Sequence, residues 1–502
     1  MKNYIHMKNI IVKSIVILIT INLATGCKDF DELRLNPNNP NKVPPSLLFT
    51  GAIPTPTSSF VDDYIFAQYH LWSSTDNTAA VNYRFGSTGF SYATLRNIDK
   101  MEQESVVTNA PVYAIMAKFL RAYYYVEMTK RLGDLPLSEA MKGAAIPQPK
   151  YDTQKSVYLQ CLNWLNQANI ELGAYISSHP GETIPGDFYY SGDLKKWQKA
   201  INAYTIRVLI SLSKKADDPD LKVKERFAAI INAPAQYPLM GSLTDNMQIT
   251  HRDEEGFRAS YNPSAATYKA SVVLADTYVD MLKKYLDPRL QKVADPTPKA
   301  LAANPTNETA VREDFNSYKG ADVSASGATN VSRKLNGDLS LPNDKRYWNF
   351  IGQPSILIGY VEQELNIAEA AHLGWVATDA KSHYDNGIKA SMQFYTVDVA
   401  VANDYLLNKA PYITGPVGLT RIYEQMYLAL AENSGWESFF MTRRTGVPSY
   451  KFSTENSVPK IPVRWAYPSA EDTDNRQNYR AALRSQFGAE IDDRDQVMWL
   501  LK

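Results

Sequence analysis

Few side chains in this 502-residue chain stand at spacings that are typical of catalysis. A zinc protease would carry H-E-x-x-H, a redox or zinc centre C-x-x-C, a serine hydrolase G-x-S-x-G, and a nucleotide site a P-loop or a dinucleotide fingerprint. None of these motifs occurs in the sequence. The sequence therefore predicts no enzyme of these classes and no cofactor.

Histidine and carboxylate side chains are the remaining candidates for chemistry. Only His372 and His383 fall in elements that should meet, and they belong to different helices. Because an isolated histidine is usually a surface or packing residue, we predict no metal site there. The run from His251 to Glu255 is a charged loop without EF-hand spacing, and no glycosidase pair of carboxylates can be selected from it.

The elements that would position any site are mainly helices. Between Ile356 and Tyr395, apolar and small residues recur at spacings of three and four in two runs, so both halves are predicted to be amphipathic helices. Gly374 can end the first helix, Trp375 can fill the corner, and Thr378 or Asp379 can cap the second. The alanines and the glycine at 387 permit a close approach that resembles a tetratricopeptide hairpin. Such a hairpin needs further helices stacked beside it.

Similar stripes predict these further helices. A helical start is expected at residues 46–53 with Ser46 as its cap. The other predicted helices cover Val61 to Trp72, Pro111 to Leu132, Thr153 to Tyr175, Leu194 to Leu212, Ala265 to Leu286, Leu419 to Ala431 and Gly435 to Met441. Tryptophans 164, 197, 375 and 436 lie in these stripes or corners and are predicted to be core residues.

Two long stretches, Ala233 to Pro263 and Ala294 to Pro354, show no such pattern and are rich in turn residues. Irregular segments of this length are often functional. The second ends in the aromatic cluster Arg346-Tyr347-Trp348-Asn349-Phe350. Because no shift in composition separates domains, we predict one large, mainly α-helical domain over residues 46–502 with long irregular loops.

The N-terminus predicts export. Lysines precede the apolar run from Ile15 to Leu23, and small residues lead into Cys27, as in a bacterial lipoprotein signal. We therefore assign residues 1–26 to a signal peptide and expect Cys27 to be lipidated. The run is too short for the roughly 20 residues that span a bilayer. Residues 27–45 would form an extended tether, because Leu35 to Pro45 contains four prolines and many asparagines.

Composition excludes some partners and leaves others open. Lys plus Arg equals Asp plus Glu at 53 each, which gives no electrostatic footprint for nucleic acid. The 32 tyrosines and 8 tryptophans suit both helix packing and ligand stacking. With Cys27 lipidated, Cys161 would be the one remaining cysteine, and its helical face predicts a buried thiol.

Seven segments, in order, resemble the SusD/RagB family of outer-membrane nutrient-binding lipoproteins, and in particular its SusD-like_2 branch. They include LNPNNPNKVPPSLLFTGAI, the helix and turn FLRAYYYVEMTKRLGDLPLSEA, YLDPRL, and RIYEQMYLALAENSGWESFFMTRRTGVP. The others begin at Ser191, Tyr360 and Ile461, so the likeness covers nearly the whole mature chain. The acidic cluster after Cys27 also resembles the signal that sends Bacteroidetes lipoproteins to the outer face of the outer membrane.

This resemblance implies a tetratricopeptide-like scaffold and a role without catalysis. The lipoprotein would bind oligosaccharides at the cell surface and pass them to a SusC-like TonB-dependent β-barrel transporter. Alternatives are a peptide-binding receptor like RagB, a surface glycoside hydrolase, or a helical scaffold that binds only proteins. The resemblance also implies a ligand site of aromatic loop residues. By position and type, the candidates are Trp72 with Asn77, Tyr347 with Trp348, and more weakly Tyr83 and Tyr92. Arg443 and Arg444 are expected to be structural.

Overall fold

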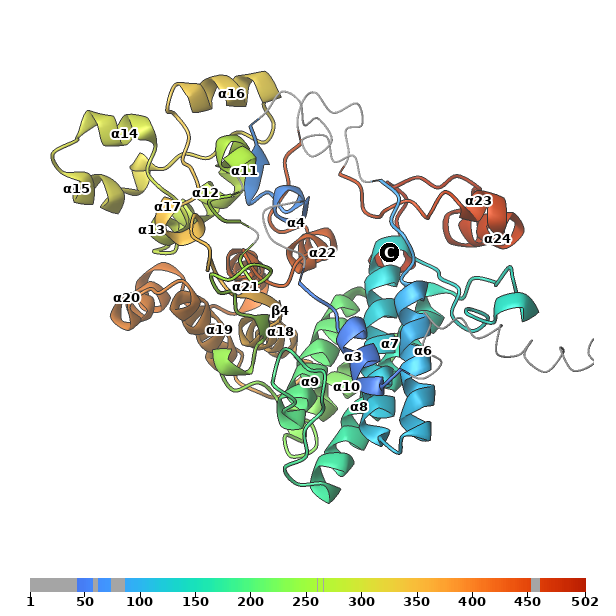
Figure 1. Cartoon of the computed structure of the whole chain (residues 1–502). Helices are drawn as coiled ribbons and strands as arrows, with labels where there is room; N and C mark the ends of the chain where they lie inside the picture. Colours follow the sequence, from blue (N-terminus) through green and yellow to red (C-terminus); the bar gives the residue numbers. More distant parts are fainter. Residues whose placement is uncertain (1–42, 57–61, 74–85, 260, 265, 453–460) are drawn as a thin grey trace, which may run out of the picture.

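Helices that lie side by side form the lower right of the molecule in Figure 1. The computed structural model describes residues 43–56, 62–73, 86–259, 261–264, 266–452 and 461–502. The bundle consists of α3 (Pro45–Ala52), α6 (Tyr92–Val107), α7 (Pro111–Leu132), α8 (Gln154–Ser178), α9 (Leu194–Ser211) and α10 (Val223–Asn232). Pro111 stands in the first turn of α7, where its missing N–H costs nothing, and Asp193 caps α9. Three of these helices were predicted almost to the residue, but α3 begins at Pro45 without a cap from Ser46.

The predicted hairpin is present as α18 (Tyr360–His372) and α19 (Ala380–Phe394). Gly374 adopts φ +74° after α18, and Asp379 accepts the amides of Lys381 and Ser382 at the start of α19. Gly387 lies directly against Leu365, where a Cβ would come within 2.7 Å of Leu365 Cγ. The absence of a side chain at 387 therefore sets how closely the two helices approach.

Short strands replace helix at three places where helix was predicted. Strand β1 (His70–Trp72) pairs antiparallel with β3 (Val272–Leu274), and β2 (Met247–Ile249) pairs with β4 (Ser355–Ile358). The helix expected over Val61 to Trp72 is only α4 (Asp62–Phe66), and the one over Ala265 to Leu286 divides into α11 (Ala266–Ser271) and α12 (Asp276–Lys284). Runs such as Val-Val-Leu and Ile-Leu-Ile are buried on both sides, and periodicity cannot assign such runs to helix or strand.

The sequence predicts an irregular loop from Ala294 to Pro354, but the structure shows regular elements there. It forms a series of short helices, α14 (Pro298–Ala303), α15 (Glu308–Glu313), α16 (Gly327–Leu335) and α17 (Asp344–Tyr347), which follow α13 (Leu290–Val293). Side chains of Thr297, Asn307, Ser326 and Asn343 cap these helices. The turn residues that suggested loops are therefore largely helix caps.

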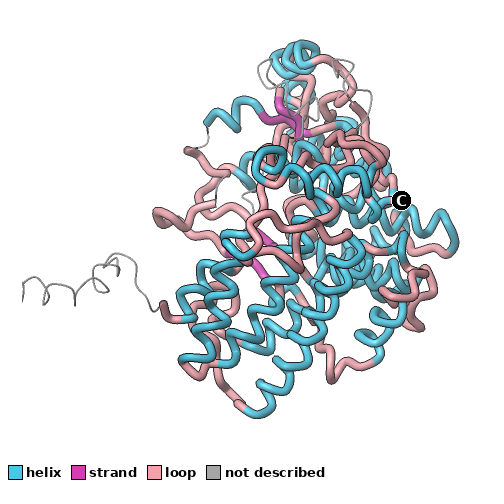
Figure 2. The backbone as a smooth tube through the Cα atoms, turned by 90° about the vertical axis from the view of Figure 1, so that its right-hand side faces the viewer, coloured by secondary structure: helices cyan, strands magenta, loops and turns pink. Residues whose placement is uncertain are grey.

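The remaining helices complete the domain. They are α20 (Val399–Asp404), α21 (Gly415–Leu430), α22 (Glu437–Thr445), α23 (Glu471–Asp474) and α24 (Arg476–Phe487). Short 3-10 or π turns stand at Gly143–Ala145, Ser213–Lys215, Leu243–Asp245, Phe315–Ser317, Tyr405–Lys409 and Trp499–Leu501. Figure 2 shows how little of the backbone is strand.

Two large apolar clusters hold the domain together. One is centred on α7, α8 and α9, where the fully buried Trp197 packs between Phe49 and Phe119. The other joins α12, α18, α19 and α21. Trp197 is thus a core residue as predicted, whereas Trp164, Trp375 and Trp436 are only partly buried at the edge of the first cluster. No helix among the described residues is long and apolar enough to cross a membrane.

Candidate functional site

Two segments from the long irregular stretches meet at the surface. The amide of Ala259 donates to the carbonyl of Phe350 at 2.9 Å, and β2 pairs with β4 close by. Their aromatic residues form what we call the aromatic shelf, namely Phe257, Tyr261, Trp348 and Phe350. The shelf joins residues that lie more than 80 positions apart in the sequence.

Each outer ring of the shelf carries a cation. The guanidinium of Arg252 lies 3.6 Å from the ring centroid of Phe257, and that of Arg258 lies 4.2 Å from Phe350. Trp348 packs on Tyr261 with ring centroids 4.1 Å apart. The ammonium of Lys269 lies 5.0 Å from the ring centroid of Trp348. Phe257 is 51% exposed, while Trp348 and Phe350 are half-buried. These three rings are therefore held in place and reachable from solvent, whereas the Tyr261 ring is only 4% exposed.

Tyr347 packs against Tyr261 of the shelf from the interior of the protein. It is only 4% exposed, and its hydroxyl donates to Glu432, which also pairs with Arg346 at 2.9 Å. Arg346 lies over the ring of Tyr395 at 4.5 Å. Burial first, and then the Glu432 carboxylate, raise the pKa of Tyr347, so its phenol stays protonated. Little of the Tyr347 ring is therefore open to a ligand in this structure.

The other selected residues are placed as follows. Trp72 is half-buried and ends β1 opposite Val272. Val272 follows Lys269, the cation on Trp348, by only three residues. Asn77, Tyr83 and Cys27 lie outside the described residues. Tyr92 belongs to the other core cluster, where its hydroxyl donates to the carbonyl of Pro136. Segment 269–272, which includes the end of α11, therefore connects the region of Trp72 to that of Trp348, whereas Tyr92 of α6 packs against the other cluster. Figure 1 shows α11 and α17 away from α6.

Carboxylates beside the shelf are held in ion pairs. Asp253 pairs with Arg258 at 2.7 Å, Glu254 pairs with Arg252 at 2.7 Å, and Asp344 pairs with Lys269. A glycosidase needs one carboxyl group that stays protonated near neutral pH to donate a proton to the leaving group. Each of these three carboxylates instead forms an ion pair, so they suit positioning of the cations.

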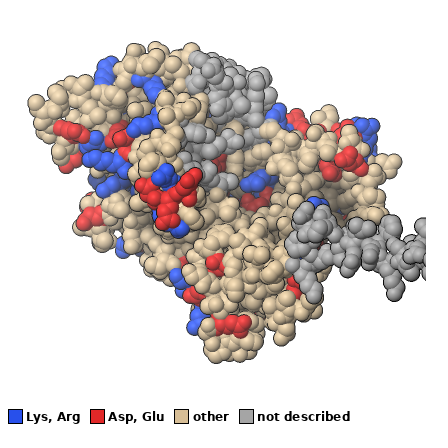
Figure 3. All heavy atoms as spheres, in the orientation of Figure 1, with Lys and Arg blue, Asp and Glu red and all other residues tan. Residues whose placement is uncertain are grey.

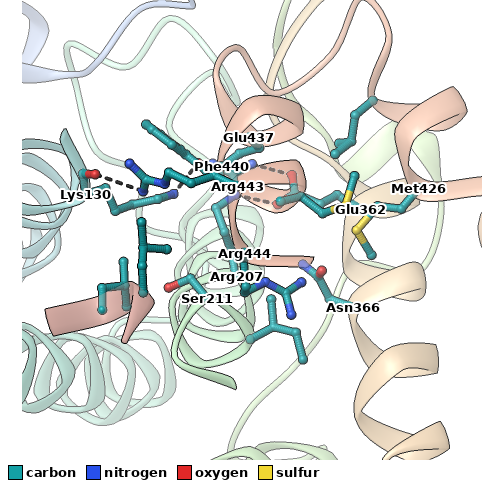
Figure 4. A pocket seen from close by; sticks show the side chains of 15 residues that line it. Lys130, Arg207, Ser211, Glu362, Asn366, Met426, Glu437, Phe440, Arg443 and Arg444 are labelled. Atoms are coloured by element: carbon teal, nitrogen blue, oxygen red, sulfur yellow. Dashed lines mark hydrogen bonds and ion pairs between the residues drawn. The ribbon is translucent and has the colours of Figure 1, made fainter. Parts of the chain in front are cut away.

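A second candidate is the internal pocket drawn in Figure 4, where α7, α9, α18 and α22 meet. The Nε of Arg207 donates to Glu362 at 2.6 Å, and Lys130 pairs with Glu437. Burial would raise the pKa of Glu437, but the nearby Lys130 and Arg207 charges hold it below its usual value. The free space is about 30 Å³, which has room for only a few water molecules. This pocket is therefore a structural ion network rather than a ligand site.

Arg443 and Arg444 belong to that network, as predicted. Arg444 Nη2 donates to Glu369 at 2.8 Å, and Arg443 donates to the carbonyls of Val463 and Lys130. Burial lowers the pKa of Arg443 to about 10. Both guanidinium groups therefore fix α22 against its neighbours.

The histidine and cysteine side chains have structural partners. His372 contacts the Tyr412 hydroxyl at 3.0 Å and the Gly415 carbonyl at 2.9 Å, while His383 contacts Glu364 at 3.0 Å. Among the described residues, no three His, Cys, Asp or Glu side chains could together hold a metal ion. Cys161 is fully buried, as predicted, and burial raises its pKa.

The sequence analysis identified the part of the shelf around Trp348 but not Phe257 and Tyr261. The cluster around Trp348 was visible as consecutive aromatic residues. Phe257 and Tyr261 stand singly in a polar loop, and their aromatic type in an irregular stretch was the one available signal. On the face of the molecule that Figure 3 shows, acidic and basic side chains are interspersed, consistent with the balanced charge of the chain.

Both a family profile and solved structures match this chain, and they point to the same family. Residues 37–468 match the profile of the SusD-like_2 family, described as starch-binding associating with outer membrane. No curated protein sequence is significantly similar to this chain.

Solved structures resemble the whole domain. A crystal structure of an outer membrane protein from Bacteroides vulgatus ATCC 8482, with an inferred role in nutrient binding, is 32% identical with a TM-score of 0.80. A SusD homolog from Bacteroides fragilis NCTC 9343 is 29% identical with a TM-score of 0.82. Each match covers 92% of this chain and 100% of the other. A chitin-binding SusD homolog from Flavobacterium johnsoniae, 18% identical with a TM-score of 0.70, covers 91% of this chain and 97% of its own and shares the fold.

Proposed function

Because the chain belongs to the SusD-like family of outer-membrane-associated, starch-binding proteins, we propose that it binds nutrient oligosaccharides at the cell surface. It passes them, without catalysis, to a SusC-like TonB-dependent outer-membrane transporter. Cys27 carries the lipid that anchors it to the outer face of the outer membrane.

The aromatic shelf is the observation that carries this proposal. Sugar rings present apolar C–H faces that pack on aromatic rings, and their hydroxyl groups need donors and acceptors nearby. Trp348 packs on Tyr261, which in turn packs on Tyr347, so little side-chain entropy of Trp348 is lost when a ligand binds. Arg258 and Lys269 bring several N–H donors to the same rings.

A binding role without turnover accords with the chemistry of the shelf. The carboxylates of Asp253, Glu254 and Asp344 are each paired with a cation that lies over an aromatic ring of the shelf. Prolonged incubation with each bound oligosaccharide should therefore return the oligosaccharide intact. Release of shorter products would identify a glycoside hydrolase instead.

Calorimetric titration of the soluble chain, truncated after Cys27, tests the binding proposal. The panel contains maltoheptaose, chitohexaose and short peptides. We expect saturable binding of one oligosaccharide class, and we expect Trp348→Ala to weaken it about tenfold or more while the protein stays folded. Phe188→Ala is the matched control, because Phe188 is 43% exposed and lies outside the shelf.

The outcomes separate the alternatives. Binding of peptides alone would identify a peptide receptor, and binding of neither class while a transporter still co-purifies would leave a protein-binding scaffold. Equal oligosaccharide affinity of Trp348→Ala and Phe188→Ala would show that the shelf is not the binding site.

The anchor and the partner need a separate test in cells. Cys27→Ser should release the chain from the outer-membrane fraction and abolish labelling by a radioactive fatty acid, because one thiol would carry the diacylglycerol. Affinity purification of the wild-type chain should recover a TonB-dependent barrel. Recovery of no barrel would contradict the transport part of the proposal.

A further inference from the structure

An open groove of about 690 Å³ runs along one side of α19. Its walls come from residues 241–243, the start of α18, and the segment between α19 and α20. This volume falls within the roughly 300–1,000 Å³ of typical small-ligand sites, unlike the 30 Å³ pocket inside the ion network. The groove lies on the side where α19 and α20 are drawn in Figure 1.

The floor of this α19 groove is a row of polar side chains. Asn386, Lys389 and Gln393 follow one another at spacings of three and four, so they point from the same face of α19. Within the part of the chain that the structure describes, Lys389 and Gln393 have no hydrogen-bond or ion-pair partner. Lys381, on the same helix, is instead paired with Asp385. The groove thus contains donors and acceptors that the protein itself does not use.

Apolar surface accompanies these groups. Tyr360 lines the groove at the start of α18, and Val399, which is 74% exposed, lines it at the start of α20. Asp398 faces the same space and uses one oxygen to accept the amide of Ala400 at 2.8 Å. One ammonium and one carboxylate balance each other, so the groove has no net preference for a charged ligand.

We propose that the α19 groove is a second oligosaccharide site, which takes a neutral segment of at least two pyranose rings. Amide side chains offer both donors and an acceptor, which matches hydroxyl groups that also do both. A peptide that binds by adding a β-strand would need a free strand edge, whereas the floor is a helix whose backbone is already bonded. The ligand class rests on the proposed function, but the site is separate from the shelf.

The separation follows from how the two sites are built. Arg346 of α17, which precedes Tyr347 and Trp348 in the chain, contacts Phe394 and Tyr395 at the C-terminal end of α19. The α19 groove begins on the exposed row of α19 that includes Asn386 and Gln393. Lys389 and Gln393 are exposed, whereas Tyr395 under Arg346 is buried, so we expect a variant at Lys389 or Gln393 to leave the Arg346 contact unchanged.

Binding stoichiometry of the soluble chain tests the inference. Maltoheptaose and chitohexaose are the neutral probes, and trigalacturonate is the acidic one. We expect two classes of site for a neutral probe, one lost in Trp348→Ala and the other weakened at least tenfold in the double variant Lys389→Ala, Gln393→Ala. Ser242→Trp, which places a ring in the groove from an exposed position, should also remove the second class. Lys381→Ala is the matched control on α19.

Each other result overturns the inference. A single class of site that only Trp348→Ala removes would leave the proposed function intact and exclude the groove. Binding of trigalacturonate alone, lost with Lys389→Ala, would replace a neutral ligand by an acidic one. Absence of binding by every probe, with folded protein, would remove both the inference and the proposed function.

Discussion

Adjacent residues of one type have opposite roles at the shelf. Tyr347 and Trp348 follow each other in one aromatic cluster, yet the first is buried on Glu432 and the second stands at the surface. The sequence shows the aromatic type of both. Which ring faces inward depends on Glu432, which lies 85 positions away, and nothing local to the cluster indicates that contact.

Tyr347→Phe should separate stability from affinity. The change leaves a buried carboxylate without one of its donors, which costs about 1–3 kcal/mol in the free energy of unfolding. Oligosaccharide affinity should stay within about twofold, because the ring remains and does not touch the ligand. Urea denaturation and calorimetric titration of the same preparation measure both quantities. A loss of affinity without a loss of stability would place Tyr347 in the binding site after all.

Asp134 should make stability depend on pH. It is 5% exposed, and burial, opposed by the amide of Gln154, raises its pKa to about 7 from the usual value near 3.9. Between these values the folded chain binds the proton and the unfolded chain does not, so stability falls as pH rises. Asp134→Asn keeps the acceptor for Gln154 and removes this titration.

We therefore expect the free energy of unfolding of Asp134→Asn, relative to that of the wild type, to rise by about 2 kcal/mol between pH 5 and pH 8. Urea denaturation at several pH values provides the measurement. Asp217→Asn serves as an exposed control, with a side chain that is 90% exposed. A constant difference between Asp134→Asn and wild type across this range would show that Asp134 is ionised throughout.

Elements were predictable where periodicity and caps agreed. Pro111 and Gly133 bracket α7, and the α18–α19 hairpin follows from its small residues and its corner. Strands β3 and β4 were read as helix, because three or four buried residues carry too little periodicity to decide. The pairing of β2 with β4, which supports the shelf, depends on contacts between distant segments. The candidate site was therefore predictable in part, through the cluster at Trp348.

Two glycines in helices should respond to alanine with opposite signs. Gly51 of α3 has open space where a Cβ would stand, so Gly51→Ala should stabilise by about 0.5 kcal/mol through helix propensity. At Gly387 a Cβ would meet Leu365 at 2.7 Å, and overpacking should cost about 1–2 kcal/mol. Thermal unfolding of both variants under one condition compares them. Stabilisation by Gly387→Ala would mean that the hairpin tolerates a wider separation of α18 and α19.

The ion network of Figure 4 joins the two apolar clusters into one domain. Arg207 extends from α9 in the first cluster, and Glu362 from α18, which contributes to the second. Arg207 also donates to the carbonyl of Leu357 at 2.8 Å, and Ser434 donates to Glu362 at 2.7 Å. Ion pairs thus join α9 to α18, α18 to α22 and α22 to α7. Charge-assisted hydrogen bonds of this kind are stronger than those between neutral groups.

Removing one partner of this pair should cost much more than removing both. Arg207→Met leaves the buried Glu362 carboxylate without its cation, at about 3–5 kcal/mol, whereas Arg207→Met with Glu362→Leu should recover more than half of that loss. Urea denaturation of both single variants and the double variant gives the coupling energy. Lys381→Ala, which breaks an exposed pair with Asp385, should cost at most about 0.5 kcal/mol. If the single and double variants were equally unstable, the network would hold the clusters together through its hydrogen-bond geometry rather than its charge balance.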